Sequence, residues 1–153
     1  MQPSFYGSPA TAEPLAWSWV DAQLAAAGTY WVTAQSTRWP HPRPVWGIWS
    51  DERLLLSIGS LVVARQAHAS PDVTVHLDSG TDVVVLEGRV AADYDLATFL
   101  AAYNEKYDWD YTLDEYGPPT VIEPRLVLAW RSAGWAGREG FVAAGKWSFD
   151  RTA

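Results

Sequence analysis

Cysteine is absent from the 153 residues of this sequence. Its absence excludes disulfide scaffolds, thiolate zinc sites, iron–sulfur clusters and cysteine nucleophiles. Histidine is scarce, and no histidine has a second histidine or a carboxylate at the spacing of a metal site on a helix or on paired strands. We therefore expect no metal site from the three histidines, which are His41, His68 and His76.

Long apolar runs and clusters of positive charge are also missing. No stretch approaches the roughly 18 apolar residues that cross a membrane, and the first twenty residues lack the basic and apolar regions of a signal peptide. The formal net charge is −7, which argues against nucleic acid or an anionic membrane as the main partner. We expect a cytoplasmic protein that binds neither membrane nor nucleic acid.

Sequence motifs of several common enzyme classes are not found. The chain has no G-x-S-x-G elbow, no complete phosphate loop of the form G-x-x-x-x-G-K-S/T, and no G-x-G-x-x-G dinucleotide motif. Four carboxylates alternate with aromatic residues in a predicted loop, where they could serve acid–base chemistry or form a solvated acidic rim. We favour the rim and assign no catalytic residue; the carboxylates are Asp108, Asp110, Asp114 and Glu115.

Aromatic residues, in contrast, are abundant. The chain has ten tryptophans and seven tyrosines, with 48% hydrophobic and 19% charged residues overall. This composition is typical of a globular protein, and a chain of this length without a linker or a repeat predicts one domain over residues 1–153. The aromatic residues either fill the core or line a pocket for a flat ligand.

The periodicity of the sequence predicts mainly β structure. Helical spacing predicts two substantial helices, over 11–28 and 95–107, and a short helix over 61–69, while three prolines predict a loop over 37–44. Hairpin-length connections make most strand neighbours antiparallel, so we expect an antiparallel β-barrel with two flanking helices. Runs of β-branched and aromatic residues predict the strands, over 29–36, 45–49, 53–59, 73–77, 81–91, 124–131 and 141–149.

The strand predicted over 45–49 (VWGIW) is the first candidate for a binding site. Strand alternation places Trp46 and Ile48 on one face and Gly47 and Trp49 on the other. Gly47 would let a flat ring approach the backbone, or it would serve a bend in the barrel. On the first interpretation, Gly47→Val should abolish ligand binding while the fold survives, because a strand tolerates valine.

Two other segments contribute polar candidates. Residues 57–60 (SIGS) end a strand and enter a helix, so their hydroxyls and amides could hold an anion at the N-terminus of that helix. Lys146 and Trp147 lie together on the last predicted strand.

At these segments the chain resembles the pyridoxamine 5′-phosphate oxidase-like superfamily of flavin-binding split barrels. The resemblance covers nearly the whole chain in the order of the family. It is carried by residues 15–17 (LAW), 29–31 (TYW), 40–47 (PHPRPVWG), 73–77 (VTVHL), 82–88 (DVVVLEG), 125–130 (RLVLAW) and 146–149 (KWSF).

The resemblance implies a homodimer of six-to-eight-stranded antiparallel split barrels, with FMN or the 8-hydroxy-5-deazaflavin coenzyme in a groove at the dimer interface. It also implies an oxidoreductase that passes a hydride between this cofactor and a small organic substrate. Val45, Trp46 and Gly47, with the neighbouring Ile48, would lie behind the ring system. The phosphate would meet Ser57, Gly59, Ser60 and Arg65, and the partner subunit would border the site with Trp130, Lys146 and Trp147.

One segment departs from the pattern of the family. Residues 61–63 are Leu, Val and Val, where the family usually carries a basic side chain that binds the cofactor phosphate. Lysine at Val63 would restore that contact if Val63 occupies the basic position. The departure favours two alternatives to an enzyme: a non-catalytic protein that binds a cofactor or ligand, or a degenerate split barrel kept for dimeric assembly with a partner.

Overall fold

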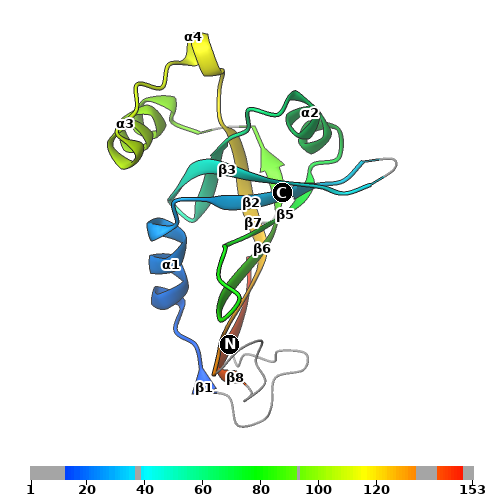
Figure 1. Cartoon of the computed structure of the whole chain (residues 1–153), viewed down its shortest axis with the longest axis vertical. Coiled ribbons are helices and arrows are strands. Elements are labelled where there is room, and N and C mark those ends of the chain that lie inside the picture. The colour runs from blue at the N-terminus through cyan, green and yellow to red at the C-terminus, as the bar shows by residue number, and fades with distance from the viewer. Residues whose placement is uncertain (1–12, 37–38, 93, 134–140, 150–153) are drawn as a thin grey trace.

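The computed structural model describes residues 13–36, 39–92, 94–133 and 141–149 (Figure 1). The helices of this part of the chain are α1 Trp17–Ala26, α2 Leu61–Ala69, α3 Leu96–Tyr107 and α4 Leu113–Tyr116. The strands are β1 Glu13–Pro14, β2 Tyr30–Ala34, β3 His41–Ser50, β4 Arg53–Ser57, β5 Asp72–His76, β6 Asp82–Ala91, β7 Thr120–Ser132 and β8 Phe141–Ser148.

Six strands close into an antiparallel barrel. They follow the order β7-β4-β3-β2-β5-β6, and the additional pairing of β6 with β7 closes the ring. Strand β8 continues the sheet from β7 in antiparallel pairing, and β1 adds a short parallel pairing to β8. The prediction of a mainly β, antiparallel split barrel with flanking helices is confirmed.

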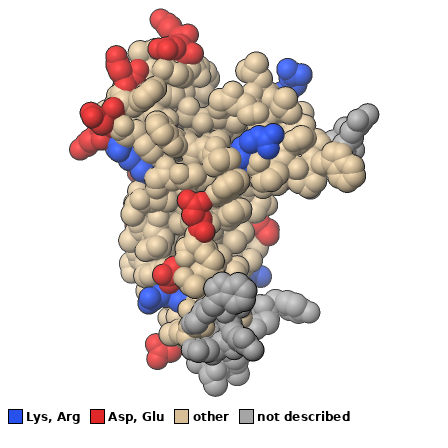
Figure 2. All heavy atoms as spheres, viewed as in Figure 1, with Lys and Arg blue, Asp and Glu red and all other residues tan. Residues whose placement is uncertain are grey.

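Apolar side chains form two cores, one inside the barrel and one outside it. Strand alternation in β4 sends Leu54 and Leu56 into the barrel interior and Leu55 into the outer core. The outer core lies under α3, where Phe99 and Tyr103 are both buried. Figure 1 shows α2, α3 and α4 at the same end of the barrel. Acidic side chains gather over α3 and α4 (Figure 2).

The first predicted helix begins later than expected. Residues 11 and 12, where the predicted helix starts, lie outside the described residues, and α1 begins at Trp17. Glu13 and Pro14 instead extend the sheet, where the N–H of Leu15 donates to the carbonyl oxygen of Ala144 over 2.9 Å. Proline disfavours helical backbone in the residue before it, and the edge of β8 offers unpaired backbone groups.

The predicted loop over 37–44 is wrong for residues 41–44, which belong to β3. Pro42 pairs with Thr33 and Pro44 with Trp31 in the ladder to β2. The two prolines occupy alternate positions, and β3 pairs with β4 only from Trp46 onward. Their missing N–H groups therefore face the unpaired side of the strand, where proline is tolerated.

The remaining elements agree with the sequence predictions, with small additions. Helix α2 spans the predicted 61–69, and Asp95 caps α3, its carboxylate accepting from the N–H of Ala97 over 3.0 Å. Strand β7 begins four residues before the predicted 124, and the short helix α4 lies in a predicted loop. Among the described residues, no helix is long and apolar enough to span a membrane. The regularly spaced glycines of the sequence at Gly134, Gly137 and Gly140 lie outside the described residues.

Gly47 faces the barrel interior, against the neighbouring strand β4. A Cβ atom at this position would lie 2.5 Å from the carbonyl oxygen of Leu55 and 2.6 Å from Cδ2 of Leu56. The predicted alternation of β3 is confirmed, because Val45 and Trp49 share this inner side whereas Ile48 belongs to the outer core. The expectation that the strand tolerates valine at residue 47 is wrong, since backbone atoms leave no room for a side chain.

We expect Gly47→Ala to lower the free energy of unfolding by about 1–3 kcal/mol, because the added methyl group overpacks a rigid backbone contact. Gly28→Ala is the matched control, since no atom lies within 4 Å of a Cβ built at Gly28. Urea unfolding of both variants measures the difference. Equal stability of the two variants would contradict the close approach of β3 to β4.

Candidate functional site

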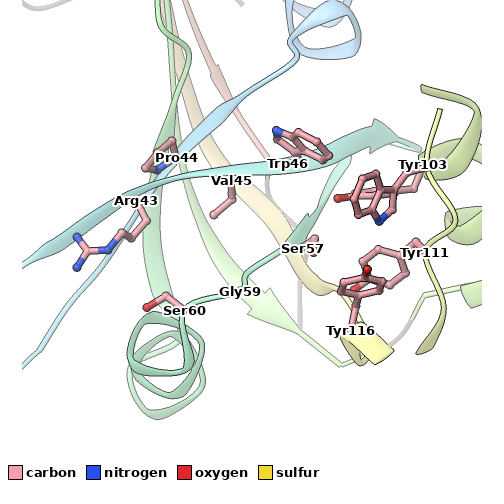
Figure 3. Close-up of a pocket in the computed structure, with 11 residues that line it drawn as sticks. Arg43, Pro44, Val45, Trp46, Ser57, Gly59, Ser60, Tyr103, Tyr111 and Tyr116 are labelled. Carbon is pink, nitrogen blue, oxygen red and sulfur yellow. The ribbon is translucent and has the colours of Figure 1, made fainter. Parts of the chain in front are cut away.

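A pocket of about 360 Å³ opens at the end of the barrel near α2, α3 and α4. Its walls come from β3, from the end of β4 and the turn into α2, from α3, and from the segment between α3 and β7. The lining residues are Arg43, Pro44, Val45, Trp46, Ser57, Gly59, Ser60, Tyr103, Trp109, Tyr111 and Tyr116 (Figure 3).

Five of the residues proposed from the sequence line this pocket: Val45, Trp46, Ser57, Gly59 and Ser60. Six others do not line it in a single chain. Gly47 faces the barrel interior, Ile48 is buried in the outer core, and Arg65 is exposed on α2. Trp130, Lys146 and Trp147 lie on β7 and β8, so their contribution from a partner subunit stays a prediction.

One end of the pocket carries the groups that suit an anion. Arg43 extends from β3, and its guanidinium donates to the carbonyl oxygen of Pro42 over 2.7 Å. Ser60 caps α2, its hydroxyl accepting from the N–H of Val63 at 3.5 Å. Figure 3 shows Arg43 and Ser60 on the same side of the pocket. Sequence reasoning missed Arg43 because the proline-rich segment predicts a loop, which hides that Arg43 precedes Val45 on one strand.

The burial of side chains at the start of α2 shows which of residues 61–63 could carry a basic side chain to a phosphate. Val63 is fully buried in the barrel core, so it cannot be the position from which a lysine would reach a phosphate. Leu61 and Val62 are 78% and 52% exposed, and these two side chains present apolar surface beside the pocket. The idea that Val63→Lys would restore phosphate binding is therefore wrong.

The other end of the pocket is built from aromatic rings. The rings of Trp46 and Trp109 meet edge to face with centroids 5.9 Å apart, and those of Tyr111 and Tyr116 lie 5.0 Å apart. Tyr103 packs against Tyr111 at 4.8 Å. The sequence signal for this wall is the alternation of aromatic and acidic residues after α3, which predicts a solvated rim and does not by itself indicate a pocket.

Local structure explains how the loop after α3 presents its rings. Asp108 ends the helix in the left-handed conformation with φ of 47°, which aspartate tolerates better than most residues. Asn104 then holds the returning chain, since its side-chain oxygen accepts from the N–H of Tyr111 over 2.7 Å and its amide donates to the Tyr111 carbonyl over 3.3 Å. The hydroxyl of Tyr111 donates to the carbonyl oxygen of Gly117 over 2.9 Å.

A polar junction behind the pocket joins α3 to β3. The hydroxyl of Tyr107 accepts from the N–H of Gly47 at 3.0 Å, and lies 2.8 Å from the Gly47 carbonyl oxygen and 3.0 Å from that of Gly28. Its ring stacks on Trp46 with centroids 4.8 Å apart. Trp46 is therefore fixed on one face by Tyr107, while the rest of the indole borders the pocket.

Lys106 lies in the same junction. Its amine donates to the hydroxyl of Tyr30 over 3.2 Å and to the carbonyl oxygen of Gly47 over 3.1 Å, without a carboxylate partner among the ion pairs of the described residues. Burial lowers the pKa of this amine from 10.5 to about 8. Burial also raises the pKa of Tyr103 to about 12, partly offset by its hydrogen bond with Ser57, so the phenol is neutral near pH 7.

Neither protein-family profiles nor curated proteins match this chain. Solved structures of similar fold include an FAD-binding protein from Mesorhizobium loti, with 18% identity, a TM-score of 0.56, and coverage of 74% of this chain and 92% of that chain. A Clostridium acetobutylicum protein of the pyridoxinephosphate oxidase family, related to a general stress protein, is 10% identical, with a TM-score of 0.62 and coverage of 87% and 94%.

An F420 reductase is 19% identical, with a TM-score of 0.51 and coverage of 69% of this chain and 93% of that chain. At such identities the similarities establish the fold alone. The chain thus has the split-barrel fold of the pyridoxamine 5′-phosphate oxidase-like proteins, which confirms the fold that the sequence resemblance predicts.

The buried amine of Lys106 makes stability depend on pH in a definite direction. Between pH 8 and 10.5 the unfolded chain binds more protons at this residue than the folded chain, so Lys106 makes the free energy of unfolding rise with pH. Lys106→Met removes this contribution and leaves the Gly47 carbonyl with Tyr107 as a partner. Lys146→Met is the control at an exposed lysine, and we expect it to retain the contribution of Lys106 to the pH dependence of the free energy of unfolding.

Denaturant unfolding of the parent and both variants at about pH 7.5 and about pH 9.5 measures this contribution. Comparison between proteins at each pH cancels the titration of tyrosines that all three share. An identical change of stability with pH in the two variants would contradict a buried, proton-releasing Lys106.

Proposed function

We propose that this chain binds FMN or the 8-hydroxy-5-deazaflavin coenzyme F420 in the pocket beside β3, and that it is an oxidoreductase acting on a small organic substrate. The observation that carries the proposal is the polarity of the pocket. A guanidinium and the N-terminus of α2 lie at one end, and aromatic rings form the other. A cofactor with an anionic phosphate and a flat ring system matches both ends.

The residues present fit the phosphate of such a cofactor. Arg43 offers a planar guanidinium whose hydrogen bonds to phosphate are charge-assisted and bidentate. The hydroxyls of Ser57 and Ser60 also line the pocket. Arg43 thus supplies the positive charge that Leu61 and Val62 cannot supply from α2.

The residues present also fit a flat ring. Val45 and Trp46 form an apolar wall on β3, and Tyr107 holds the indole of Trp46 in place by stacking. When bound, the cofactor itself carries the hydride or electrons. The task of this chain is then to orient the ring, to exclude water with its aromatic wall, and to keep Tyr103 as a neutral hydroxyl beside Ser57.

The names of structural neighbours support this proposal. They include an FAD-binding protein, an F420 reductase and a protein of the pyridoxinephosphate oxidase family. A cytoplasmic location belongs to the same proposal.

A homodimer completes the proposed site. Apolar side chains remain exposed around the pocket, among them Leu61, Val62 and Trp109, and burial against a second subunit would remove them from water. The partner's β7 and β8 would then contribute the residues that do not line the pocket of their own chain, Trp130, Lys146 and Trp147.

A second candidate function is cofactor or ligand binding without catalysis. The apolar, exposed surface of Leu61 and Val62 favours it, because one guanidinium binds a phosphate more weakly than a guanidinium with a second basic side chain. The two functions differ in whether the bound cofactor is reduced and reoxidised with a substrate.

We expect Arg43→Ala to weaken FMN binding by about ten- to a hundredfold, because a charge-assisted hydrogen bond contributes about 1.5–3 kcal/mol. Riboflavin, which lacks the phosphate, should bind the parent and the variant equally. Arg65→Ala is the matched control, since Arg65 lies on α2 outside the pocket lining. Calorimetric titration of the cofactor-free protein measures both ligands.

Equal affinity of the parent for FMN and riboflavin would mean that no phosphate site lies in this pocket. If Arg65→Ala weakens FMN binding and Arg43→Ala does not, the phosphate binds on the outer side of α2 and not in the pocket. F420 titrated in the same way decides between the two cofactors.

We also expect the protein to sediment as a dimer, at twice the 16.9 kDa of the chain. Sedimentation velocity at micromolar concentration measures the mass. Leu61→Asp should shift the population toward monomer, because it introduces a charge into the exposed apolar surface. A monomeric parent protein would remove the partner-subunit half of the proposed site.

A further inference from the structure

The aromatic end of the pocket leaves ring surface exposed to solvent. Trp46, Trp109 and Tyr116 are 44%, 46% and 42% exposed, whereas Tyr103 and Tyr111 behind them are buried. The rings come from β3, from the loop after α3 and from α4, so three separate elements bring them to one cavity. Figure 3 shows Tyr103, Tyr111 and Tyr116 on the side of the pocket opposite Arg43.

The ring faces at this end meet no cation of the described residues. Cation contacts with rings in that part of the chain involve Lys106 with Tyr30 and Tyr107, and Arg131 with Trp19. The amine of Lys106 is held by hydrogen bonds to the hydroxyl of Tyr30 and to the carbonyl oxygen of Gly47. The aromatic wall is therefore available to a cation from outside the chain.

The segment that carries these rings is strongly acidic. Between residues 107 and 124 the sequence contains no lysine or arginine, and its carboxylates include Asp108, Asp110, Asp114 and Glu115. None of these four takes part in the ion pairs found among the described residues, which join Arg53 to Glu123, Arg89 to Asp72 and Arg131 to Asp82. A hydrogen bond with Glu115, with added repulsion from the charges of Glu115 and Asp110, raises the pKa of Tyr116. The rings thus lie in a negative field, which attracts cations.

We propose that the aromatic end of this pocket binds a positively charged organic amine, with a quaternary or alkylated ammonium group held against Trp46, Trp109 and Tyr116. Ring faces attract such cations by their quadrupole, and the four carboxylates around them add a longer-range attraction. That this amine is the substrate of the protein rests on the proposed function, whereas the binding of the amine to the pocket does not.

The opposite polarity of the two ends gives the pocket its selectivity. An anionic phosphate is attracted to Arg43 and repelled by the carboxylates after α3, and a cationic amine has the reverse preference. The phosphate of the cofactor and the ammonium group of the amine are therefore directed to opposite ends of one pocket. A substrate with a carboxylate or phosphate group would be repelled from the aromatic end.

Three small probes of one shape test the proposal on the parent protein. Choline, 3,3-dimethylbutan-1-ol and 3,3-dimethylbutanoate share a branched head of the same shape. The head is positively charged in choline and neutral in the other two, and the butanoate carries a negative charge at its opposite end. In calorimetric titrations at low salt, we expect choline to bind at least about tenfold more tightly than the alcohol, with no binding of the carboxylate. Equal affinity for choline and the alcohol would overturn the proposal, because it would reduce the site to an apolar surface.

Variants locate the site. Trp109→Leu should weaken choline binding by about tenfold, because it removes one ring, whereas Trp39→Leu, at an exposed tryptophan outside the pocket, should leave it unchanged. Asp110→Asn should weaken choline binding most at low salt, and Asp72→Asn on β5 is the control. Choline binding that survives Trp109→Leu unchanged would overturn the proposal.

FMN titrations of the same samples separate the two proposals. Tighter binding of choline than of the neutral alcohol, without FMN binding, would contradict the proposed cofactor and support the amine site. FMN binding with equal affinity for choline and the alcohol would contradict the amine site and support the cofactor.

Discussion

The hydroxyl of Tyr107 joins the outer layer of the molecule to the barrel at Gly47, and the rest of the site depends on this junction. Gly47 has no side chain because β4 approaches it on its inner side, and Tyr107 bonds its backbone. The same tyrosine stacks on Trp46, so one residue fixes both the strand and the wall of the pocket. Because Tyr107 ends α3, it also sets where the chain leaves that helix toward the aromatic end.

Most of the fold follows from the local sequence. Alternation in β3 and β4, the cap of α3 at Asp95 and the short helix over 61–69 all depend on neighbouring residues, and the structure contains each of them. Two of the errors involve proline. Pro14 pairs with Ala144 of β8, far away in the sequence, whereas Pro42 pairs with Thr33 of the preceding strand β2. Both prolines lie in strands because a partner strand is present beside them, which the local preference of proline does not show.

The site is less predictable from the sequence than the fold. The sequence predicts Val45, Trp46 and residues 57–60 as part of the site, because they lie on one predicted strand and at one predicted helix start. It does not predict Arg43, which lies on the part of β3 that the prolines disguise as a loop. It also does not predict Trp109 and Tyr116, because a loop held by Asn104 brings them to the pocket. Gly47 shows the same limit, because its need for glycine comes from the close approach of β4 on the inner side, and the predicted pairing of the two strands does not reveal that approach.

A crystal structure of the protein soaked with FMN tests the central claim most directly. The account predicts the phosphate within hydrogen-bond distance of the Arg43 guanidinium and the Ser60 hydroxyl, with the ring system against Val45 and Trp46. A phosphate bound on the outer side of α2 at Arg65, or FMN absent from this pocket at saturating concentration, would contradict it.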